Sequence, residues 1–243
     1  MSIISNKKEI IKMSELKNRK VVEANDLITS IAKMDKNPLK IFELAVSCIN
    51  TNNPPKDNVV YLSKKELFSL FDVSDSDKHT RFKKTIEKMQ EQAFFEIRQE
   101  LNKGLKFRRI VPIPEVSWND FNDEVYIRFD QAIIPYLIDL KTNFTQYALT
   151  DVMGLESKYS IILYKWFSMN FNQFEHYEYK NKRTKKQLEE YKNPKILMSE
   201  FRIMTDTEKT YKNFPMLKKR VIDYAVEEIS RLTHFDISYE PIR

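Results

Sequence analysis

The chain has 243 residues, and its 41 Lys and Arg residues outnumber its 35 Asp and Glu residues, which gives a formal net charge of +6. This length allows one or two domains with a hydrophobic core, and the basic excess suits a polyanionic partner without requiring one. Because only two glycines occur, Gly104 and Gly154, the sequence excludes Gly-rich phosphate-binding loops of the P-loop or dinucleotide type.

The scarce residue types exclude further classes of protein. Cys48, the single cysteine, lies in an apolar stretch and is interpreted as a small buried hydrophobe, and a chain without disulfides suits the cytoplasm. No apolar run approaches the ~20 residues of a membrane helix, so we expect no membrane contact. The three histidines, His79, His176 and His234, lack metal-ligand spacing, and no nucleophile motif is present. We therefore expect no enzymatic activity, no catalytic or metal-binding residue and no cofactor.

The first half of the chain predicts helices followed by a hairpin. Residues 1–20 are polar and are expected to be a mobile tail, and 21–35 are expected to form a first helix. Asn37 and Pro38 signal the start of a second helix, which is apolar nearly all round and therefore buried. Residues 50–58 read as a loop.

A charged helix and a strand pair come next. A capping box from Ser63 to Glu66 predicts a short helix through Phe71. The periodicity of 75–92 predicts a longer helix. Strands are expected over 94–100 and 105–112, around an Asn102-Lys103-Gly104 turn, and again over 125–129.

The second half repeats this plan. We expect a helical stretch at 133–140 followed by a connector, an apolar helix at 157–171 that opens a second domain, and a basic loop at 175–195. A short helix at 199–204 and a strand at 235–239 flank the most informative segment, 211–232.

Residues 211–232 read as one amphipathic helix that begins near Pro215. Its predicted apolar face comprises Leu217, Val221, Tyr224, Ala225, Ile229 and Leu232. Its predicted charged side comprises Lys212, Lys219, Arg220, Asp223, Glu227 and Arg231. Helix, turn, charged helix and strand is the order of a winged helix, whose second helix can enter the DNA major groove.

The predicted fold is therefore α+β and mostly helical, with two tandem winged-helix domains. We expect the tail at 1–20, an N-terminal winged-helix domain at 21–140 and a C-terminal one at 141–243. The chain ends after what reads as the first strand of the wing in the C-terminal domain, so this wing is expected to be incomplete.

Four segments resemble the RepB-type initiator proteins of iteron-containing, theta-replicating plasmids. The segments are VVEANDLITSIAKMDKNPLKIFELAVS, KHTRFKKTIEKM, SKYSIILYKWF and YKNFPMLKKRVIDYAVEEISRLTHFDISYE. The resemblance implies two winged-helix domains that bind direct repeats of double-stranded DNA at a plasmid origin. It also implies opening of AT-rich DNA, recruitment of a host helicase or initiator, autorepression at an inverted-repeat operator, and a homodimer through the N-terminal domain.

Within this framework, we assign DNA contacts to residues on the 211–232 helix. Its N-terminal end favours phosphate through the helix dipole and free N–H groups, and basic side chains concentrate there. Lys212, Asn213 and Lys218 are assigned chiefly to phosphates, Lys219, Arg220 and Asp223 to base edges, and Arg231 to the same DNA-binding surface. The alternative is a solvated face on which Lys219, Asp223 and Glu227 form i,i+4 pairs.

Two further basic stripes are candidate DNA contacts. Lys78, Arg81, Lys84 and Lys88 lie along the predicted 75–92 helix, and Lys103, Lys106 and Arg108 lie on the predicted hairpin. Both stripes also fit a solvated surface. The basic cluster at 180–186 fits either a solvated loop or a DNA arm.

Three other functions remain open. The first is a dimeric winged-helix transcriptional regulator without a replication role. The second is a DNA-nicking enzyme, which needs a paired-histidine metal site that the sequence does not show. The third is a winged helix that binds only proteins.

Overall fold

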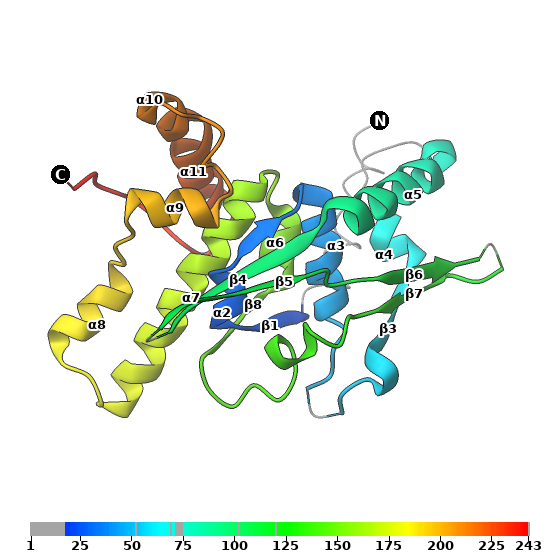
Figure 1. Ribbon diagram of the computed structural model, residues 1–243, viewed down its shortest axis with the longest axis horizontal. Coiled ribbons are helices and arrows are strands. Elements are labelled where there is room, and N and C mark those ends of the chain that lie inside the picture. Colours follow the sequence, from blue (N-terminus) through cyan, green and yellow to red (C-terminus); the bar gives the residue numbers. More distant parts are fainter. Residues whose placement is uncertain are drawn as a thin grey trace.

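The computed structural model describes residues 18–51, 53–68, 70, 75–101, 103–119 and 121–242. Predictions for 1–17, for Phe71 and for Asn102 lie outside the described residues. Within them, the chain forms a helix-rich α+β structure that contains three small antiparallel sheets (Figure 1).

The helices of the described chain differ in length, from 4 to 23 residues. They are α2 (Asn25–Ile28), α3 (Lys36–Val46), α4 (Lys64–Phe68), α5 (Asp75–Gln92), α6 (Leu149–Gly154), α7 (Lys158–Lys180), α8 (Lys185–Lys192), α9 (Met198–Met204), α10 (Phe214–Leu217) and α11 (Asp223–Leu232). Short 3₁₀ turns, η1 (Lys56–Asn58) and η2 (Ile134–Tyr136), and a π-helical turn, η3 (Lys218–Ile222), complete the helical elements of the described chain.

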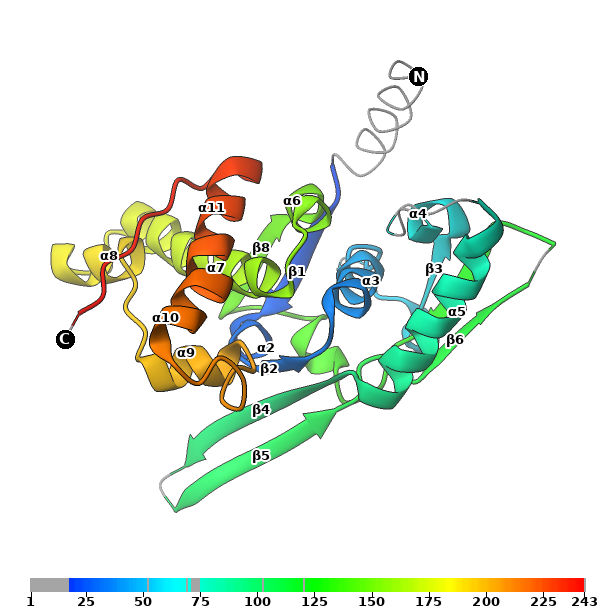
Figure 2. The same cartoon turned by 90° about the horizontal axis from the view of Figure 1, so that it is seen from above.

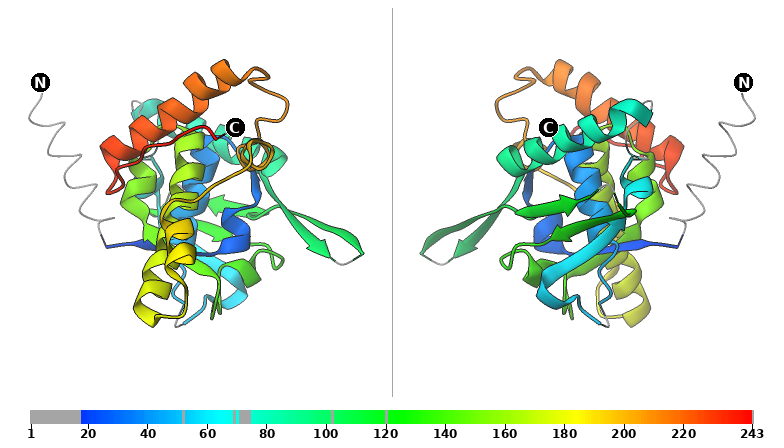
Figure 3. Two further views of the ribbon diagram at one scale, coloured as in Figure 1. Left: turned by 90° about the vertical axis from the view of Figure 1, so that its left-hand side faces the viewer. Right: turned by 90° about the vertical axis from the view of Figure 1, so that its right-hand side faces the viewer.

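The strands pair over long sequence distances. They are β1 (Lys20–Ala24), β2 (Ile31–Lys33), β3 (Val59–Ser63), β4 (Phe94–Leu101), β5 (Gly104–Ile110), β6 (Glu115–Trp118), β7 (Glu124–Arg128) and β8 (Phe144–Ala148). The sheet orders are β1-β8, β2-β4-β5 and β3-β7-β6. The β4–β5 hairpin projects from the body of the molecule (Figure 3).

Several sequence predictions are confirmed. Helix α5 covers 75–92 and buries Phe82, Ile86 and Met89, and α3 is buried along most of its length. Half of the predicted capping box before α4 is present, since the Glu66 carboxylate accepts from the Ser63 backbone N–H at 3.4 Å, but the Ser63 hydroxyl accepts from the Lys65 N–H at 3.1 Å. The hairpin at 94–110, the strand at 125–129 and the short helix near 199–204 are also present.

Three local predictions are wrong. Residues 21–35 do not form one helix, because β1 and β2 pair with the distant strands β8 and β4 and leave room only for the one-turn helix α2. The stretch 133–140 contains only the 3₁₀ turn η2, and β8 follows it. Residues 235–239 run extended but pair with no strand of the described chain.

The predicted basic loop at 175–195 is also wrong. Helix α7 continues through Lys180, Asn181 ends it in the left-handed conformation, and Thr184 opens α8. The Thr184 side chain accepts from the Gln187 backbone N–H while the Gln187 side chain accepts from the Thr184 N–H, which is a complete capping box. The basic cluster therefore lies on a helical hairpin rather than in a loop.

Buried charges fasten the first half of the chain to α7. The Lys165 ammonium lies 2.8 Å from the Glu23 carboxylate and 2.6 Å from that of Glu43, and the Tyr147 hydroxyl donates to Glu43 at 2.7 Å. Glu23 and Glu43 are fully buried. Burial and the neighbouring charge of Glu43, opposed by Lys165, raise the pKa of Glu23 to about 7. Elements β1, α3, β8 and α7 therefore share one polar cluster inside the core.

Candidate nucleic-acid interface

The segment 214–232 forms one nearly continuous helix made of α10, η3 and α11, and we call it the C-terminal helix (Figure 1). Asn213 caps its start, because the Asn213 side chain accepts from the Met216 backbone N–H at 2.9 Å. Pro215 occupies the first turn, as the sequence predicts, where its missing N–H costs no hydrogen bond.

The buried face of this helix differs from the predicted one beyond its first two turns. Leu217, Val221, Ala225 and Ile229 are fully buried, as expected. Tyr224 and Leu232 are exposed, however, and Ile222 and Glu228 are buried in their place. The π-helical turn at 218–222 accounts for the change, because a turn with i→i+5 bonds takes more residues than an α-helical turn and alters the helical period. Ala225 and Ile229 stay buried after it, while the edges of the buried face change.

The outer face of the C-terminal helix carries exposed cations. The side chains of Lys212, Lys219, Arg220 and Arg231 are exposed. Within the described part of the chain, none of these four side chains forms an ion pair or hydrogen bond, so the i,i+4 pair of Lys219 with Asp223, which belonged to the alternative of a solvated face, is not present. Glu227 shares this face, which is therefore basic toward its N-terminal end and mixed farther along.

Two of the predicted contact residues are instead paired with each other. The Lys218 ammonium lies 2.8 and 2.9 Å from the two carboxylate oxygens of Asp223, and the Tyr239 hydroxyl donates to the same carboxylate at 2.5 Å. These hydrogen bonds raise the pKa of Lys218 and lower that of Asp223. The pair spans the π-helical turn and fastens the segment after α11 to the C-terminal helix.

Arg202, which the sequence analysis did not single out, organises the turn before the helix. Its guanidinium donates to the carbonyl oxygens of four residues between α9 and α10: Thr207, Thr210, Tyr211 and Lys212. A basic side chain in the last turn of a short helix is the only sequence signal for this role, and it is a weak one. Arg202 thereby fixes the backbone that leads into the Asn213 cap.

The predicted stripe on α5 is present on its outer surface. Arg81 and Lys84 are exposed, Lys78 is half-buried, and Lys88 is exposed and pairs with Asp35. Lys83, beside them, forms an i,i+4 pair with Glu87 at 3.9 Å. This helix therefore presents a partly neutralised basic face.

The hairpin contributes fewer outward cations than its sequence suggests. Lys103 and Lys106 are exposed, but Arg108 is half-buried and its guanidinium donates to the Tyr136 hydroxyl at 3.3 Å. The guanidinium of Arg109 lies 3.3 Å from the centre of the Phe94 ring. Aromatic neighbours thus hold two of the hairpin arginines.

Helix α5 and the C-terminal helix lie on the same side of the molecule. Figure 1 shows both along its upper edge, and Figure 2, seen from above, shows both on the near face, with α3 between them. The Lys33–Asp206 ion pair and the hydrogen bond from the Glu156 N–H to the Glu228 carboxylate, at 2.9 Å, connect the two halves of the chain. The α7–α8 hairpin lies on the opposite side (Figures 1 and 3).

The α7–α8 hairpin holds its basic cluster by aromatic packing. Tyr177 and Tyr191 stack with ring centres 5.6 Å apart, and the Arg183 guanidinium lies 4.4 Å from the centre of the Tyr177 ring. Lys185 and Lys186 are exposed in the first turn of α8. This cluster and the outer face of the C-terminal helix are two separate basic surfaces.

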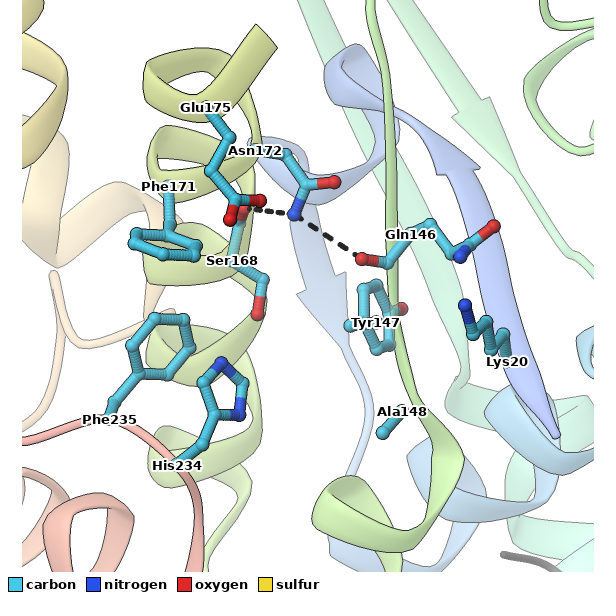
Figure 4. A pocket seen from close by; sticks show the side chains of 10 residues that line it. All are labelled: Lys20, Gln146, Tyr147, Ala148, Ser168, Phe171, Asn172, Glu175, His234 and Phe235. Carbon is cyan, nitrogen blue, oxygen red and sulfur yellow. Dashed lines mark hydrogen bonds between the residues drawn. The ribbon is translucent and has the colours of Figure 1, made fainter. Parts of the chain in front are cut away.

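A pocket of about 280 Å³ lies where the segment after α11 crosses α7 and β8 (Figure 4). Asn172 bridges its walls by donating to the carbonyl oxygens of Gln146 and Ser168. Phe171 and Phe235 pack edge to face with ring centres 5.7 Å apart. Across the described ranges, no cluster of three or more His, Cys, Asp or Glu residues could hold a metal ion, and no helix is long and apolar enough to cross a membrane.

Two charged helices, each preceded by a short helix and presented on one side of an α+β framework, define a protein with two winged-helix units. The family model described as Initiator Replication protein, WH1 matches residues 20–168, and the model described as Initiator Rep protein, WH2 matches residues 197–243. The chain therefore belongs to the family of initiator replication (Rep) proteins. The predicted α+β fold with tandem winged helices and the resemblance to plasmid replication initiators are confirmed.

Individual relatives agree with this family. A replication initiation protein from Escherichia coli is 26% identical over 213 residues, which cover 86% of this chain and 60% of that protein. The chain thus spans about 60% of the length of this curated relative. The crystal structure of Pi initiator protein in complex with iteron DNA superposes with a TM-score of 0.62 at 19% identity, over 91% of this chain and 89% of the other. That likeness concerns the fold.

The division of the chain at residue 140 stays a prediction. The first family match continues to residue 168, and β1 pairs with β8 across the predicted boundary.

Proposed function

We propose that this protein initiates plasmid replication by binding repeated double-stranded DNA sites at the origin. The observation that carries the proposal is the outer face of the C-terminal helix. There Lys219 and Arg220 are exposed and have no partner within the described ranges, while Leu217 and Val221 anchor the opposite face in the core. In helix-turn-helix relatives this element lies in the major groove, with its N-terminal residues at the base edges.

The start of the C-terminal helix suits phosphate. Backbone N–H groups at a helix start and the positive end of the helix dipole attract anions, and Lys212 and Lys219 add formal charge there. We assign Lys212 and the exposed edge of Asn213 to phosphates, and Lys219 and Arg220 to base edges, where Arg and Lys recognise guanine. Lys218 and Asp223 hold each other, so they act in this proposal by shaping the helix.

The first winged helix supplies a second contact on the same duplex. Because α5 and the C-terminal helix face the same way, one side of a duplex can meet both, at major grooves about 34 Å apart. Arg81 and Lys84 are the exposed cations of α5, and Lys103 and Lys106 extend the basic surface along the hairpin. The Pi initiator relative, which was crystallised with iteron DNA, supports direct repeats as the target.

Bound to the repeats, the protein opens adjacent AT-rich DNA, recruits host replication proteins such as a helicase or initiator, and represses its own promoter at an inverted repeat. A homodimer through the N-terminal domain belongs to the repressing state. The proposed role requires no catalytic residue and no cofactor.

Permanganate footprinting on a supercoiled plasmid that carries the direct repeats beside the gene tests the proposal. We expect protection of the repeats and new reactivity of thymines in the neighbouring AT-rich stretch. Binding to an inverted repeat alone, without opening, would support a transcriptional regulator, and a nicked or covalently bound product with divalent metal would support a nicking enzyme. Lack of affinity for any duplex across a salt series would support a winged helix that binds only proteins.

A further inference from the structure

The outer face of the C-terminal helix carries exposed apolar side chains between its cations. Met216 is 50% exposed, Tyr224 is 47% exposed and Phe214 is 40% exposed. Single exposed hydrophobic residues are common on protein surfaces. Here, however, three of them occur within eleven residues of one helix, around Lys219 and Arg220, and the first domain's charged helix α5 shows no comparable group among its described side chains.

The backbone of Met216 is held in place by two separate contacts. Its N–H donates to the side chain of Asn213, and the turn before Asn213 is fixed by the guanidinium of Arg202. The next residue, Leu217, is fully buried and anchors the first turn to the core. The unbranched thioether of Met216 therefore extends from a fixed point at the N-terminal end of the helix, where a recognition helix meets base edges.

The major groove offers one apolar group, the C5-methyl of thymine. An apolar side chain on the outer face of a recognition helix that is flanked by cations matches this group, because the cations engage phosphates or guanine while the apolar side chain excludes water from the methyl. Contact with water alone provides no favourable interaction for the exposed apolar side chain of Met216 beside Lys219 and Arg220.

We propose that Met216 is a specificity-determining residue whose side chain contacts thymine methyl groups in the bound repeat, with Tyr224 extending the apolar contact along the groove. This inference rests on the proposed DNA-binding function. It predicts that the protein distinguishes thymine from uracil, which pairs identically but lacks the methyl group.

The experiment uses a duplex selected by the full chain from a random library of about 30 base pairs, and a second duplex in which deoxyuridine replaces the thymines of the selected site. Fluorescence anisotropy at one fixed salt concentration gives both affinities. We expect the wild-type protein to bind the deoxyuridine duplex about fourfold more weakly for each methyl contacted, the factor that corresponds to about 0.8 kcal/mol for one buried methylene-sized group.

The variant Met216→Ala is expected to bind the thymine duplex more weakly than the wild type and to lose less affinity than the wild type on the deoxyuridine duplex, because only the Tyr224 contact remains. Met198→Ala is the matched control, because Met198 is also an exposed methionine but lies on α9. Met198→Ala is expected to lose as much affinity on the deoxyuridine duplex as the wild type does.

Each outcome bears on a different claim. If no sequence is enriched by selection, the proposed function fails and the inference fails with it. If a site is enriched but contains no thymine, if deoxyuridine costs the wild type nothing, or if Met216→Ala loses as much on deoxyuridine as the wild type, the assignment to Met216 fails while sequence-specific binding stands.

Discussion

The buried cluster of Glu23, Glu43, Lys165 and Tyr147 predicts a defined pH dependence of stability. Two buried carboxylates face a single ammonium, so the site carries one excess negative charge when both are ionised. Neither oxygen of Glu23 forms a hydrogen bond within the described residues, and only one of them lies beside the Lys165 ammonium. A buried charge of this kind is costly, and protonation of Glu23 removes the cost.

The size of the effect follows from the pKa change of Glu23. Its pKa rises from 4.5 to about 7 on folding, which corresponds to about 3 kcal/mol at roughly 1.36 kcal/mol per unit. The folded state binds the proton more tightly than the unfolded state, so this contribution is fully present below pH 4.5. It is lost as the pH rises through about 7.

The test compares the wild type with Glu23→Gln by urea unfolding, followed by circular dichroism at pH 5 and pH 8. Glutamine keeps the shape of the side chain but cannot ionise, so we expect the wild type to lose about 2–3 kcal/mol relative to the variant between these two pH values. Glu115→Gln, at the exposed pair with Arg128, is the control and is expected to stay within about 1 kcal/mol of the wild type at both. Equal pH slopes for Glu23→Gln and the wild type would refute the reasoning.

Three further predictions concern the C-terminal helix. Leu217→Ala removes a fully buried anchor and is expected to lower the free energy of unfolding by about 2–5 kcal/mol, and an unchanged urea midpoint would contradict the packing described. Asn213→Ala is expected to lower the free energy of unfolding by about 1 kcal/mol through loss of the helix cap, which calorimetry measures. Asn213→Asp is expected to keep the cap but to weaken DNA binding, measured by anisotropy, because it adds a negative charge beside the phosphates. Lys219→Ala or Arg220→Ala is expected to weaken specific binding by about 1–3 kcal/mol with loss of preference at one base position, while Lys212→Ala lowers the log–log salt slope by about one for every sequence.

Sequence periodicity predicted α5 and the start of the C-terminal helix well because their signals are local, whereas the last turns of α7 were predicted as a loop. Phe82, Ile86 and Met89 recur at helical spacing within α5, and Asn213 and Pro215 mark the start of the C-terminal helix. The short strands carry no such signal. The three residues of β2 become a strand only because β4, more than sixty residues later in the chain, supplies its hydrogen bonds.

The candidate site was predictable only in part. The cations of 212–231 were found by their charge, but a regular 3.6-residue period placed Tyr224 on the buried face, and the π-helical turn at 218–222 moves it outward. The partner of Lys218 was missed for the same reason, because its pair with Asp223 spans five residues. The role of Arg202 depends on the path of the turn that it holds, which no local pattern encodes.

The most direct test of the account asks which of the two basic surfaces meets DNA. One double variant carries Lys219→Glu and Arg220→Glu on the C-terminal helix, and the other carries Lys185→Glu and Lys186→Glu on α8. Both change the net charge by the same amount. Anisotropy against the selected duplex and a scrambled duplex at one salt concentration is expected to show loss of the sequence preference only for the first pair. The central claim would be contradicted if the 219/220 double variant kept the sequence preference and the 185/186 double variant lost it.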